Sequence, residues 1–332
     1  MTNDKEVLVE LKDVKKEFVT SKTWAGKPLK VVHAVDRVNL SIYKGETIGV
    51  VGESGCGKST LGRCILRLLN PTSGEVIYRG QDITRYNKEQ MRQMRRKMQL
   101  VFQDPYASLN PWMTVLELIK APLDAFGIGN NEERIQKVRE IMELVGMPEN
   151  MMNRYPHEFS GGQRQRIVIA RALVLDPEFV VCDEPVSALD VSVRAQVLNL
   201  IQDLKKTKDL TYLFISHDLS VVKYISDRIA VMYLGRVVEV AKKEDLYQNP
   251  AHPYTKALLS AIPIPDVDNQ MKREILTGDV PSPLNPPSGC YFHTRCKYAT
   301  ELCRTKCPEL HDVGDGHMAA CHLCQSGQKG RQ

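Results

Sequence analysis

Apolar and polar positions alternate along residues 32–46, where polar residues separate Val38, Leu40 and Ile42. This period of two predicts a half-buried antiparallel strand. A continuous apolar run follows at 47–52, TIGVVG, and such a run is typical of a strand that is buried on both faces. A helical pattern begins soon afterwards, in KSTLGRCILRLL at 58–69. The order strand, glycine-containing loop, helix predicts an α/β fold.

Helical spacing dominates residues 114–155, for example in ERIQKVREIMELVG at 133–146. It predicts a helical subdomain, over about 104–175, inserted into the α/β domain. Strands resume at FVVCDE, 179–184, and at TYLFISHD, 211–218. The chain between these two strands is expected to form a helix, whose apolar face consists of Val193, Val197, Leu200, Ile201 and Leu204. We therefore expect one α/β domain over residues 1–245.

The composition changes after residue 245. The segments NPAHPYTKALLSAIPIPD and GDVPSPLNPPSGC are rich in proline, and six of the nine cysteines follow residue 289. Residues 246–332 are therefore expected to form a linker and a small cysteine-rich module that binds a metal.

Composition narrows the class of protein. The N-terminal segment has no apolar core of a signal peptide, and no apolar run approaches the ~20 residues of a membrane span. We expect a cytosolic protein that reaches a membrane only through a partner, and cysteines that do not form disulfides. The net charge of +5 is compatible with nucleotides but too small to argue for nucleic acid.

A phosphate-binding loop is the clearest chemical signal. GESGCGKS, at 52–59, fits G-x-x-x-x-G-K-[ST] between a buried strand and a helix. Its backbone N–H groups would surround phosphates, Lys58 would reach the β- and γ-phosphates, and the Ser59 hydroxyl would bind Mg²⁺. The expected ATP-binding residues of this loop are Gly52, Glu53, Ser54, Gly55, Cys56, Gly57, Lys58, Ser59 and Thr60.

Polar residues at the ends of the later strands complete a catalytic pattern. Asp183 would lie near the metal, directly or through water, and Glu184 would polarise the attacking water. Gln103, after MQLVF, would sense Mg²⁺ or that water, and His217 would contact the γ-phosphate. Taken alone, a histidine at a strand end is more often structural.

A second glycine-rich segment, SGGQRQR at 160–166, is typical of a helix N-terminus that attracts an anion. Together with the phosphate loop, Gln103, CDE, SALD and His217, this segment resembles ATP-binding-cassette (ABC) ATPases over about residues 6–245. The resemblance implies an ABC ATPase fold, with a RecA-like core, an antiparallel β subdomain and the helical insertion.

The resemblance also implies a head-to-tail dimer. In it, Ser160, Gly161, Gly162 and Gln163 would cap the γ-phosphate of ATP held by the opposing phosphate loop. The loop that crosses the interface would be SALD: Ser187, Ala188, Leu189 and Asp190. Phe18 matches the aromatic residue that stacks on adenine, although an ordinary core phenylalanine would fit the same position. Phe159 replaces the usual leucine before SGGQ and would serve as an anchor.

Two further segments resemble the oligopeptide/dipeptide importer branch of the family: FQDPYASLNPWMTV at 102–115 and NPAHPYTKALLSAIP at 249–263. The resemblance implies a second ATPase subunit, two transmembrane permease subunits and, indirectly, an extracytoplasmic substrate-binding protein. It places the chain at the cytoplasmic face of the membrane, as a peripheral subunit. Nickel, glutathione and opine importers belong to the same branch. The motifs are also compatible with a soluble ABC ATPase or with a regulatory subunit without turnover.

The tail carries a candidate metal site. Cys290, Cys296, Cys303 and Cys321 follow the order C-x5-C-x6-C-x17-C, and the resemblance implies that these four hold a [4Fe–4S] cluster. The competing hypothesis is zinc, held in a ribbon of Cys303, Cys307, Cys321 and Cys324 or with help from His293 and His322. Unligated thiols are the third possibility.

Overall fold

The computed structural model describes residues 6–22, 28–261, 276 and 278–325. The chain divides into two compact units. The first unit contains residues 1–42, 48–85 and 216–332, and the second contains residues 43–47 and 86–215. None of the helices in the described residues is both long enough and apolar enough to span a membrane.

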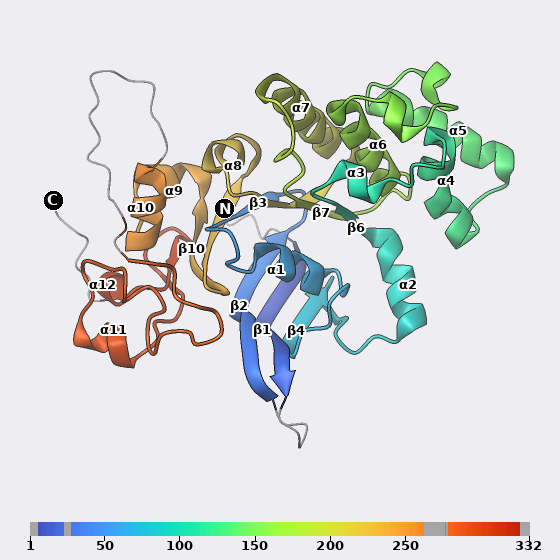
Figure 1. Ribbon diagram of the computed structural model, residues 1–332. Helices are drawn as coiled ribbons and strands as arrows, with labels where there is room; N and C mark the ends of the chain where they lie inside the picture. The colour runs from blue at the N-terminus through green and yellow to red at the C-terminus, as the bar shows by residue number, and fades with distance from the viewer. Residues whose placement is uncertain (1–5, 23–27, 262–275, 277, 326–332) are drawn as a thin grey trace, which may run out of the picture. The chain divides into compact units, whose positions relative to one another are not determined.

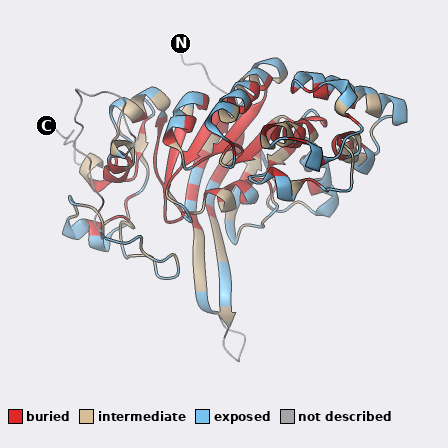
Figure 2. Ribbon diagram, turned by 45° about the horizontal axis from the view of Figure 1, so that its top comes forward, coloured by how far each residue is buried: buried red, intermediate tan, exposed pale blue. Residues whose placement is uncertain are grey.

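The first unit begins with a four-stranded sheet in the order β2-β1-β4-β5. Its strands are β1 (Val7–Lys22), β2 (Pro28–Tyr43), β4 (Ser73–Tyr78) and β5 (Gln81–Asp82), and β1 pairs antiparallel with β4. The predicted alternation in β2 is confirmed, because Val38, Leu40 and Ile42 are buried whereas Arg37 and Asn39 are exposed. Figure 2 shows that burial fades toward the far ends of β1 and β2.

A second group of strands in the first unit has the order β11-β12-β10-β9-β3. The fully buried β3 (Thr47–Val51) pairs parallel with β9 (Arg228–Tyr233), and β10 (Arg236–Lys242) returns antiparallel to β9. The short strands β11 (His311–Asp312) and β12 (Met318–Ala319) extend the sheet from β10. The helices of this unit are α1 (Lys58–Ile65), α8 (Leu219–Ile225), α9 (Lys243–Gln248), α10 (Pro253–Ser260), α11 (Glu301–Thr305) and α12 (His322–Gln325).

The second unit contains three parallel strands in the order β8-β7-β6: β6 (Met98–Val101), β7 (Phe179–Asp183) and β8 (Thr211–Ile215). β7 and β8 are buried throughout, as their continuous apolar sequences predict. The remaining elements are helical (Figure 1): α2 (Lys88–Lys97), α3 (Pro105–Ser108), α4 (Val115–Phe126), α5 (Asn131–Leu144), η1 (Glu149–Met151), η2 (Pro156–Glu158), α6 (Gly161–Leu173) and α7 (Val191–Lys208).

The linker prediction needs correction at its start. Residues 253–260 form helix α10, and Tyr254 is fully buried. Pro253 occupies the first helical position, and the side chain of His252 accepts a hydrogen bond from the Tyr254 N–H at 3.0 Å. Proline near this segment therefore starts a packed helix instead of marking a linker. The later part of the predicted linker, up to residue 275, lies outside the described residues.

The helix after the phosphate loop is also shorter than predicted. α1 ends at Ile65, because Arg67 adopts a left-handed backbone conformation with φ 52°. The apolar residues Leu68 and Leu69 continue the helical pattern of the sequence beyond the end of the helix.

Candidate nucleotide-binding and catalytic site

The backbone of the phosphate loop has room for glycine alone at two positions. A Cβ atom on Gly52 would lie 2.2 Å from the carbonyl oxygen of Met232, and one on Gly57 would lie 2.0 Å from the carbonyl oxygen of Ala34. Both glycines also have positive φ angles, of 153° and 102°. The loop therefore packs directly on the neighbouring backbone, and Ser54 and Gly55 are left exposed at its tip.

Lys58 is buried at the base of this loop. Its Nζ donates to the carbonyl oxygens of Gly52, at 2.8 Å, and Glu53, at 3.0 Å. Helix α1 begins here, its N-cap is Gly57 without a side-chain cap, and its first turn carries no acidic residue. An uncapped helix N-terminus beside a buried ammonium group suits a phosphate.

Both the backbone and the side chain of Glu53 form hydrogen bonds. Its N–H donates to the Tyr254 hydroxyl at 3.1 Å. Its two carboxylate oxygens accept from Nη1 of Arg295, at 3.1 and 2.9 Å. Neither Tyr254 nor Arg295 was expected in this site from the sequence, since no local motif links either residue to the phosphate loop.

His217 lies in the same unit, between β8 and α8, and is exposed. The preceding residue, Ser216, donates its N–H to the carbonyl oxygen of Val50 in β3, the strand that leads into the phosphate loop. Phe18, on β1, is 37% exposed, and the Lys16 ammonium lies 5.1 Å from its ring centroid. The Phe18 ring is therefore available to an aromatic ligand, in contrast to a buried core phenylalanine.

Gln103, Asp183 and Glu184 lie in the second unit, at the ends of two paired strands. β6 and β7 are parallel, with Val101 opposite Cys182. Nε2 of Gln103 donates to Oε2 of Glu184 at 3.1 Å. Glu184 has a left-handed backbone with φ 47°, and its N–H donates to the Ile215 carbonyl of β8 at 3.0 Å. The structure thus brings two of the predicted catalytic residues into contact, beside the buried Asp183.

The SGGQ segment begins helix α6 with a capping box. The Ser160 hydroxyl accepts from the Gln163 N–H at 3.4 Å, and the Gln163 side chain accepts from the Ser160 N–H at 3.0 Å. Ser160 is exposed, whereas Phe159 before it is buried, as expected of an anchor. The N–H groups of the two glycines at the start of α6 therefore lie next to an exposed serine.

The two glycines have different surroundings. A Cβ on Gly162 would lie 2.3 Å from Cγ1 of Val193 in α7, so close packing of α6 on α7 requires glycine there. A Cβ on Gly161 would lie 3.4 Å from Cδ2 of Leu189, which is ordinary contact. Leu189 belongs to SALD, so the start of α6 and this loop lie next to each other within the second unit. Ser187 anchors the loop by donating its hydroxyl to the Glu184 carbonyl at 3.0 Å.

The four cysteines predicted as ligands share one small cavity in the first unit. Its lining consists of His252, Pro253, Cys290, Phe292, His293, Cys296, Tyr298, Cys303, Cys321, His322 and Leu323. The backbone connects two of the four cysteines, because the Cys290 N–H donates to the Cys303 carbonyl at 2.8 Å. Burial raises the pKa of the Cys290 thiol to about 12. Within the described residues, no group of three or more His, Cys, Asp or Glu side chains is arranged to hold a metal ion.

The remaining two cysteines of the tail have other surroundings. Nη1 of Arg236 donates to Sγ of Cys307, and Cys307 is not part of the cavity lining. Cys324 interacts with Cys321, and the hydrogen bond from the Cys324 thiol lowers the pKa of the Cys321 thiol. Sγ of Cys324 also lies 3.6 Å from the carbonyl oxygen of Ala251.

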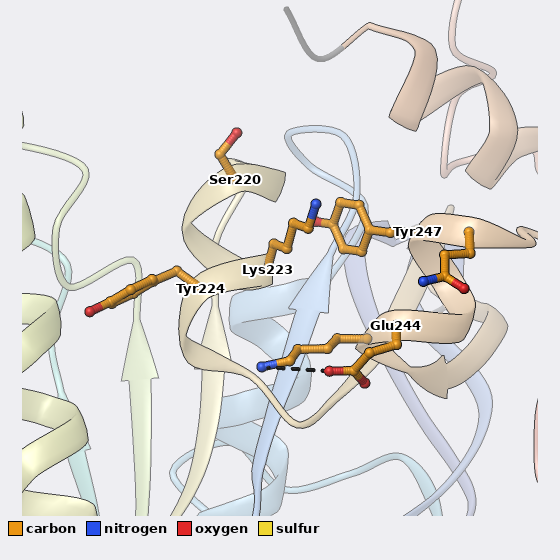
Figure 3. Close-up of a pocket in the computed structure, with 7 residues that line it drawn as sticks. Ser220, Lys223, Tyr224, Glu244 and Tyr247 are labelled. Atoms are coloured by element: carbon orange, nitrogen blue, oxygen red, sulfur yellow. Dashed lines mark ion pairs between the residues drawn. The ribbon is translucent and has the colours of Figure 1, made fainter. Parts of the chain in front are cut away.

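A separate surface hollow lies between α8 and α9 (Figure 3). The Lys223 ammonium lies 4.8 Å from the ring centroid of Tyr247, and Lys243 pairs with Glu244 at 3.9 Å. None of the residues predicted from the sequence lines this hollow. Its lining residues are Ser220, Lys223, Tyr224, Lys243, Glu244, Tyr247 and Gln248.

Two family models match the chain. Residues 35–187 match the ABC transporter model, and residues 238–303 match the oligopeptide/dipeptide transporter C-terminal region. The first range includes the phosphate loop, Gln103, SGGQ and Glu184. The second range includes the His252–Tyr254 segment and three of the four cysteines that line the cavity.

Curated relatives match nearly the whole chain. The oligopeptide transport ATP-binding protein AppF of Bacillus subtilis is 52% identical over 96% of this chain and 98% of its own length. The oligopeptide transport ATP-binding protein OppF of Salmonella typhimurium is 51% identical over 96% of each chain. A putative peptide import ATP-binding protein of Brucella ovis is 56% identical over 86% of this chain and 90% of its own.

A solved structure has the same fold as the cassette part. It is a dimeric post-hydrolysis state of the ATP-binding cassette MJ0796 bound to ADP and Pi, 31% identical, with a TM-score of 0.64 over 71% of this chain and 99% of that chain. These matches confirm the resemblance that the sequence motifs indicated. The chain belongs to the ABC transporter family, in the group of peptide-import ATP-binding proteins that carry the oligopeptide/dipeptide transporter C-terminal region.

Proposed function

We propose that this ABC-type ATPase energises the import of oligopeptides or dipeptides across the cell membrane. The observation that carries the proposal is the presence, in one chain, of a cassette ATPase and the peptide-transporter C-terminal region. Relatives more than 50% identical are named as oligopeptide transport ATP-binding proteins. Nickel, glutathione or opine uptake is the competing hypothesis, because the ATPase subunit of such an importer does not contact the cargo.

The residues of the site suggest a division of labour in ATP hydrolysis. Lys58 and the N–H groups of 52–60 would bind the phosphates, as the uncapped start of α1 suits an anion. Ser59, Gln103 and Asp183 would hold Mg²⁺, which neutralises charge on the β- and γ-phosphates when bound. Glu184 would orient and polarise the attacking water, with its carboxylate held by Gln103, while His217 would contact the γ-phosphate and Phe18 would stack on adenine.

We further propose that two ATPase subunits pack head to tail, so that the start of α6 in one subunit caps the ATP of the other. Ser160, the N-cap of α6, is exposed, so a ligand from another chain could reach this helix start. Ser160→Arg should then impair hydrolysis at the site that uses the partner's phosphate loop. In a mixed complex with one mutated subunit, failure only at the site that uses this chain's own Lys58 would contradict the arrangement.

Exposed aromatic side chains support docking on a membrane partner. Phe102, Tyr106 and Trp112 follow or flank Gln103 and are 42%, 61% and 86% exposed. Aromatic residues of this kind are typical hot spots of protein interfaces. We propose that this segment contacts the transmembrane permease subunits, of which there would be two. The chain would then act at the cytoplasmic face of the membrane, beside a second ATPase subunit and with an extracytoplasmic binding protein as an indirect partner.

We also propose that the cysteine-rich module holds a [4Fe–4S] cluster on Cys290, Cys296, Cys303 and Cys321. Support for this set comes from the cavity that all four residues line, although the described side chains are not arranged as a preformed metal site, and Cys307 is engaged by Arg236 outside that cavity. A [4Fe–4S] cluster is held by four cysteine thiolates, and four cysteines line this cavity. Bound there, it would cross-link a short module that has few large apolar residues.

The cluster proposal has a direct test. Anaerobically purified protein should be brown, with broad absorbance near about 400 nm and stoichiometric iron and sulfide. Cys303→Ser should abolish this absorbance, whereas Cys307→Ser should retain it. Colourless protein with one bound zinc, or equal loss in both variants, would contradict the ligand set.

Transport is tested in the assembled complex. The chain should co-purify with two integral membrane subunits, and peptide with its binding protein should stimulate ATP turnover in proteoliposomes. Trp112→Ala should reduce co-purification, with Trp24→Ala as a control for loss of the second tryptophan. A chain that never associates with membrane subunits would favour the soluble ABC ATPase. Stimulation by nickel complexes or glutathione in place of peptide would redirect the cargo.

A further inference from the structure

We propose that the cysteine-rich module positions the phosphate loop, with Arg295 as the positioning residue and Glu53 as its contact in the loop. Through this contact, the module of the tail sets the affinity of the ATP site. The inference goes beyond the transport function, and only its last step, on the state of the cysteines, rests on the proposed cluster.

The contact itself is a shielded ion pair. Nη1 of Arg295 donates to both carboxylate oxygens of Glu53, at 3.1 and 2.9 Å. The Arg295 side chain is 7% exposed and that of Glu53 is 24% exposed. The guanidinium carbon also lies 5.9 Å from the ring centroid of Tyr233, in β9. A charged pair in such surroundings is screened less by water than a surface pair. Its loss should therefore loosen the conformation of the phosphate loop.

The second hold on Glu53 comes from helix α10. The Tyr254 hydroxyl accepts the Glu53 N–H at 3.1 Å. The Tyr254 ring packs against Phe292 of the module, with ring centroids 5.4 Å apart, and against Tyr233 at 4.7 Å. Backbone and side chain of Glu53 are therefore fixed by two segments that come from the C-terminal part of the chain.

Glu53 transmits its position to the phosphate-binding lysine. The Glu53 carbonyl accepts from Lys58 Nζ at 3.0 Å, and the adjoining Gly52 carbonyl accepts at 2.8 Å. Movement of Glu53 therefore displaces an atom that holds the ammonium group. Because phosphate binding depends on preorganised donors, a loosened loop should bind ATP less tightly.

Arg295 lies inside the loop that joins two cysteines of the cavity. Its N–H donates to the Phe292 carbonyl at 3.0 Å, and the Cys296 N–H donates to the His293 carbonyl at 3.4 Å. The Cys290 N–H is bonded to the Cys303 carbonyl at 2.8 Å. Ligation of Cys290 and Cys296 would fix this loop at both ends. A change in the ligation of these cysteines should therefore alter the position of Lys58 through Arg295 and Glu53.

The test measures ATP and ADP affinity of the full-length chain, with melting temperature and iron content recorded for each variant. Arg295→Met should weaken ATP binding about tenfold, within the usual range of coupling between sites. Arg295→Lys, which keeps the charge, should recover part of the affinity. Arg304→Met is the matched control, because Arg304 belongs to the same module but forms an exposed pair with Glu301 at 3.8 Å.

A double-mutant cycle separates positioning from a purely structural role. Glu53→Gln alone should weaken ATP binding to a similar degree, and Arg295→Met combined with Glu53→Gln should add little further loss. Additive losses, or ATP affinity within twofold of wild type in a folded Arg295→Met protein, would overturn the proposal. If Arg295→Met does not fold, Glu53→Gln decides the question, because it leaves the module intact.

Reciprocity gives an independent readout. If the module sets ATP affinity, ATP must in turn stabilise the module, so the amides of 290–296 should exchange hydrogen more slowly with nucleotide bound. Unchanged exchange there, alongside slower exchange in the phosphate loop, would also overturn the proposal. Affinity and exchange are measured without cargo, and variants are compared at equal metal content, so failure here is distinguishable from failure of the transport or cluster proposals.

Discussion

Nε2 of Gln103 donates a 3.1 Å hydrogen bond to Oε2 of Glu184, and the two residues follow neighbouring parallel strands, β6 and β7. The bond restrains the orientation of the carboxylate that would polarise the attacking water. Gln103 can therefore influence hydrolysis by orienting Glu184, in addition to any contact with the metal.

Gln103→Leu should lower kcat by at least about tenfold and change ATP affinity far less, since one positioned hydrogen bond near the reacting water is lost. Steady-state ATPase kinetics and equilibrium ATP binding measure the two effects. Gln99→Leu is the matched control, because Gln99 lies on β6, the strand that Gln103 follows, and hydrogen-bonds to the Arg95 carbonyl. Equal kcat in the two variants would speak against a role for the contact with Glu184.

Gly162→Ala should destabilise the chain by about 1–3 kcal/mol, because its methyl group would lie 2.3 Å from Cγ1 of Val193 and force α6 away from α7. Chemical unfolding measures the loss. Gly161→Ala serves as the control for stability, since a Cβ there meets Leu189 at 3.4 Å. Val193→Ala should restore much of the stability lost in Gly162→Ala. Failure of this rescue would mean that another contact makes glycine necessary.

The pH dependence of stability should contain a contribution from His252. Burial lowers the pKa of His252 from 6.5 to about 4, against the opposing effect of Glu239. Below pH 6.5 the His252 imidazole is therefore protonated in the unfolded chain, whereas in the folded chain it stays neutral until about pH 4. Stability should fall as the pH falls through this window, by about 3 kcal/mol in total.

Unfolding free energies measured between pH 7.5 and 4 test this dependence. His252→Asn retains a good helix N-cap but cannot titrate, so its stability should change less over the window. His157→Asn, at an exposed position, is the control. The Glu239 carboxyl contributes from about pH 4.5 downward, at the lower end of this window, because its hydrogen bonds, including that from His317, lower its pKa from 4.5 despite burial. Identical slopes in the wild type and His252→Asn would contradict the assignment.

Local pattern predicted most of the strands and the motif residues, because each depends on neighbours in sequence. The alternation in β2, the buried runs of β3, β7 and β8, and the helix N-terminus at Ser160 all follow from short-range spacing. Even the meeting of Gln103 and Glu184 follows from their places after parallel strands, since the carboxyl ends of such strands share one edge of a sheet.

Contacts between distant parts of the chain could not be predicted from local sequence patterns. Arg295 and Glu53 are separated by 242 positions, and no local motif in either segment indicates a contact with the other. The same limit applies to the cysteines, whose spacing alone fitted two ligand sets. Cys307 is distinguished from Cys303 by its contact with Arg236, a residue of β10, and by its place outside the cavity. The prolines before α10 were ambiguous for a different reason, because proline both interrupts helices and begins them.

Glu184→Gln tests the central claim most directly, with ATP binding and ATP turnover measured on the same assembled complex. The substitution keeps the shape of the side chain and its contact with Gln103 but removes the carboxylate that would polarise water. The account predicts ATP affinity close to that of the wild type and turnover reduced by at least about a hundredfold, with the ATP-bound closed assembly accumulating. Steady-state hydrolysis near the wild-type rate would contradict it.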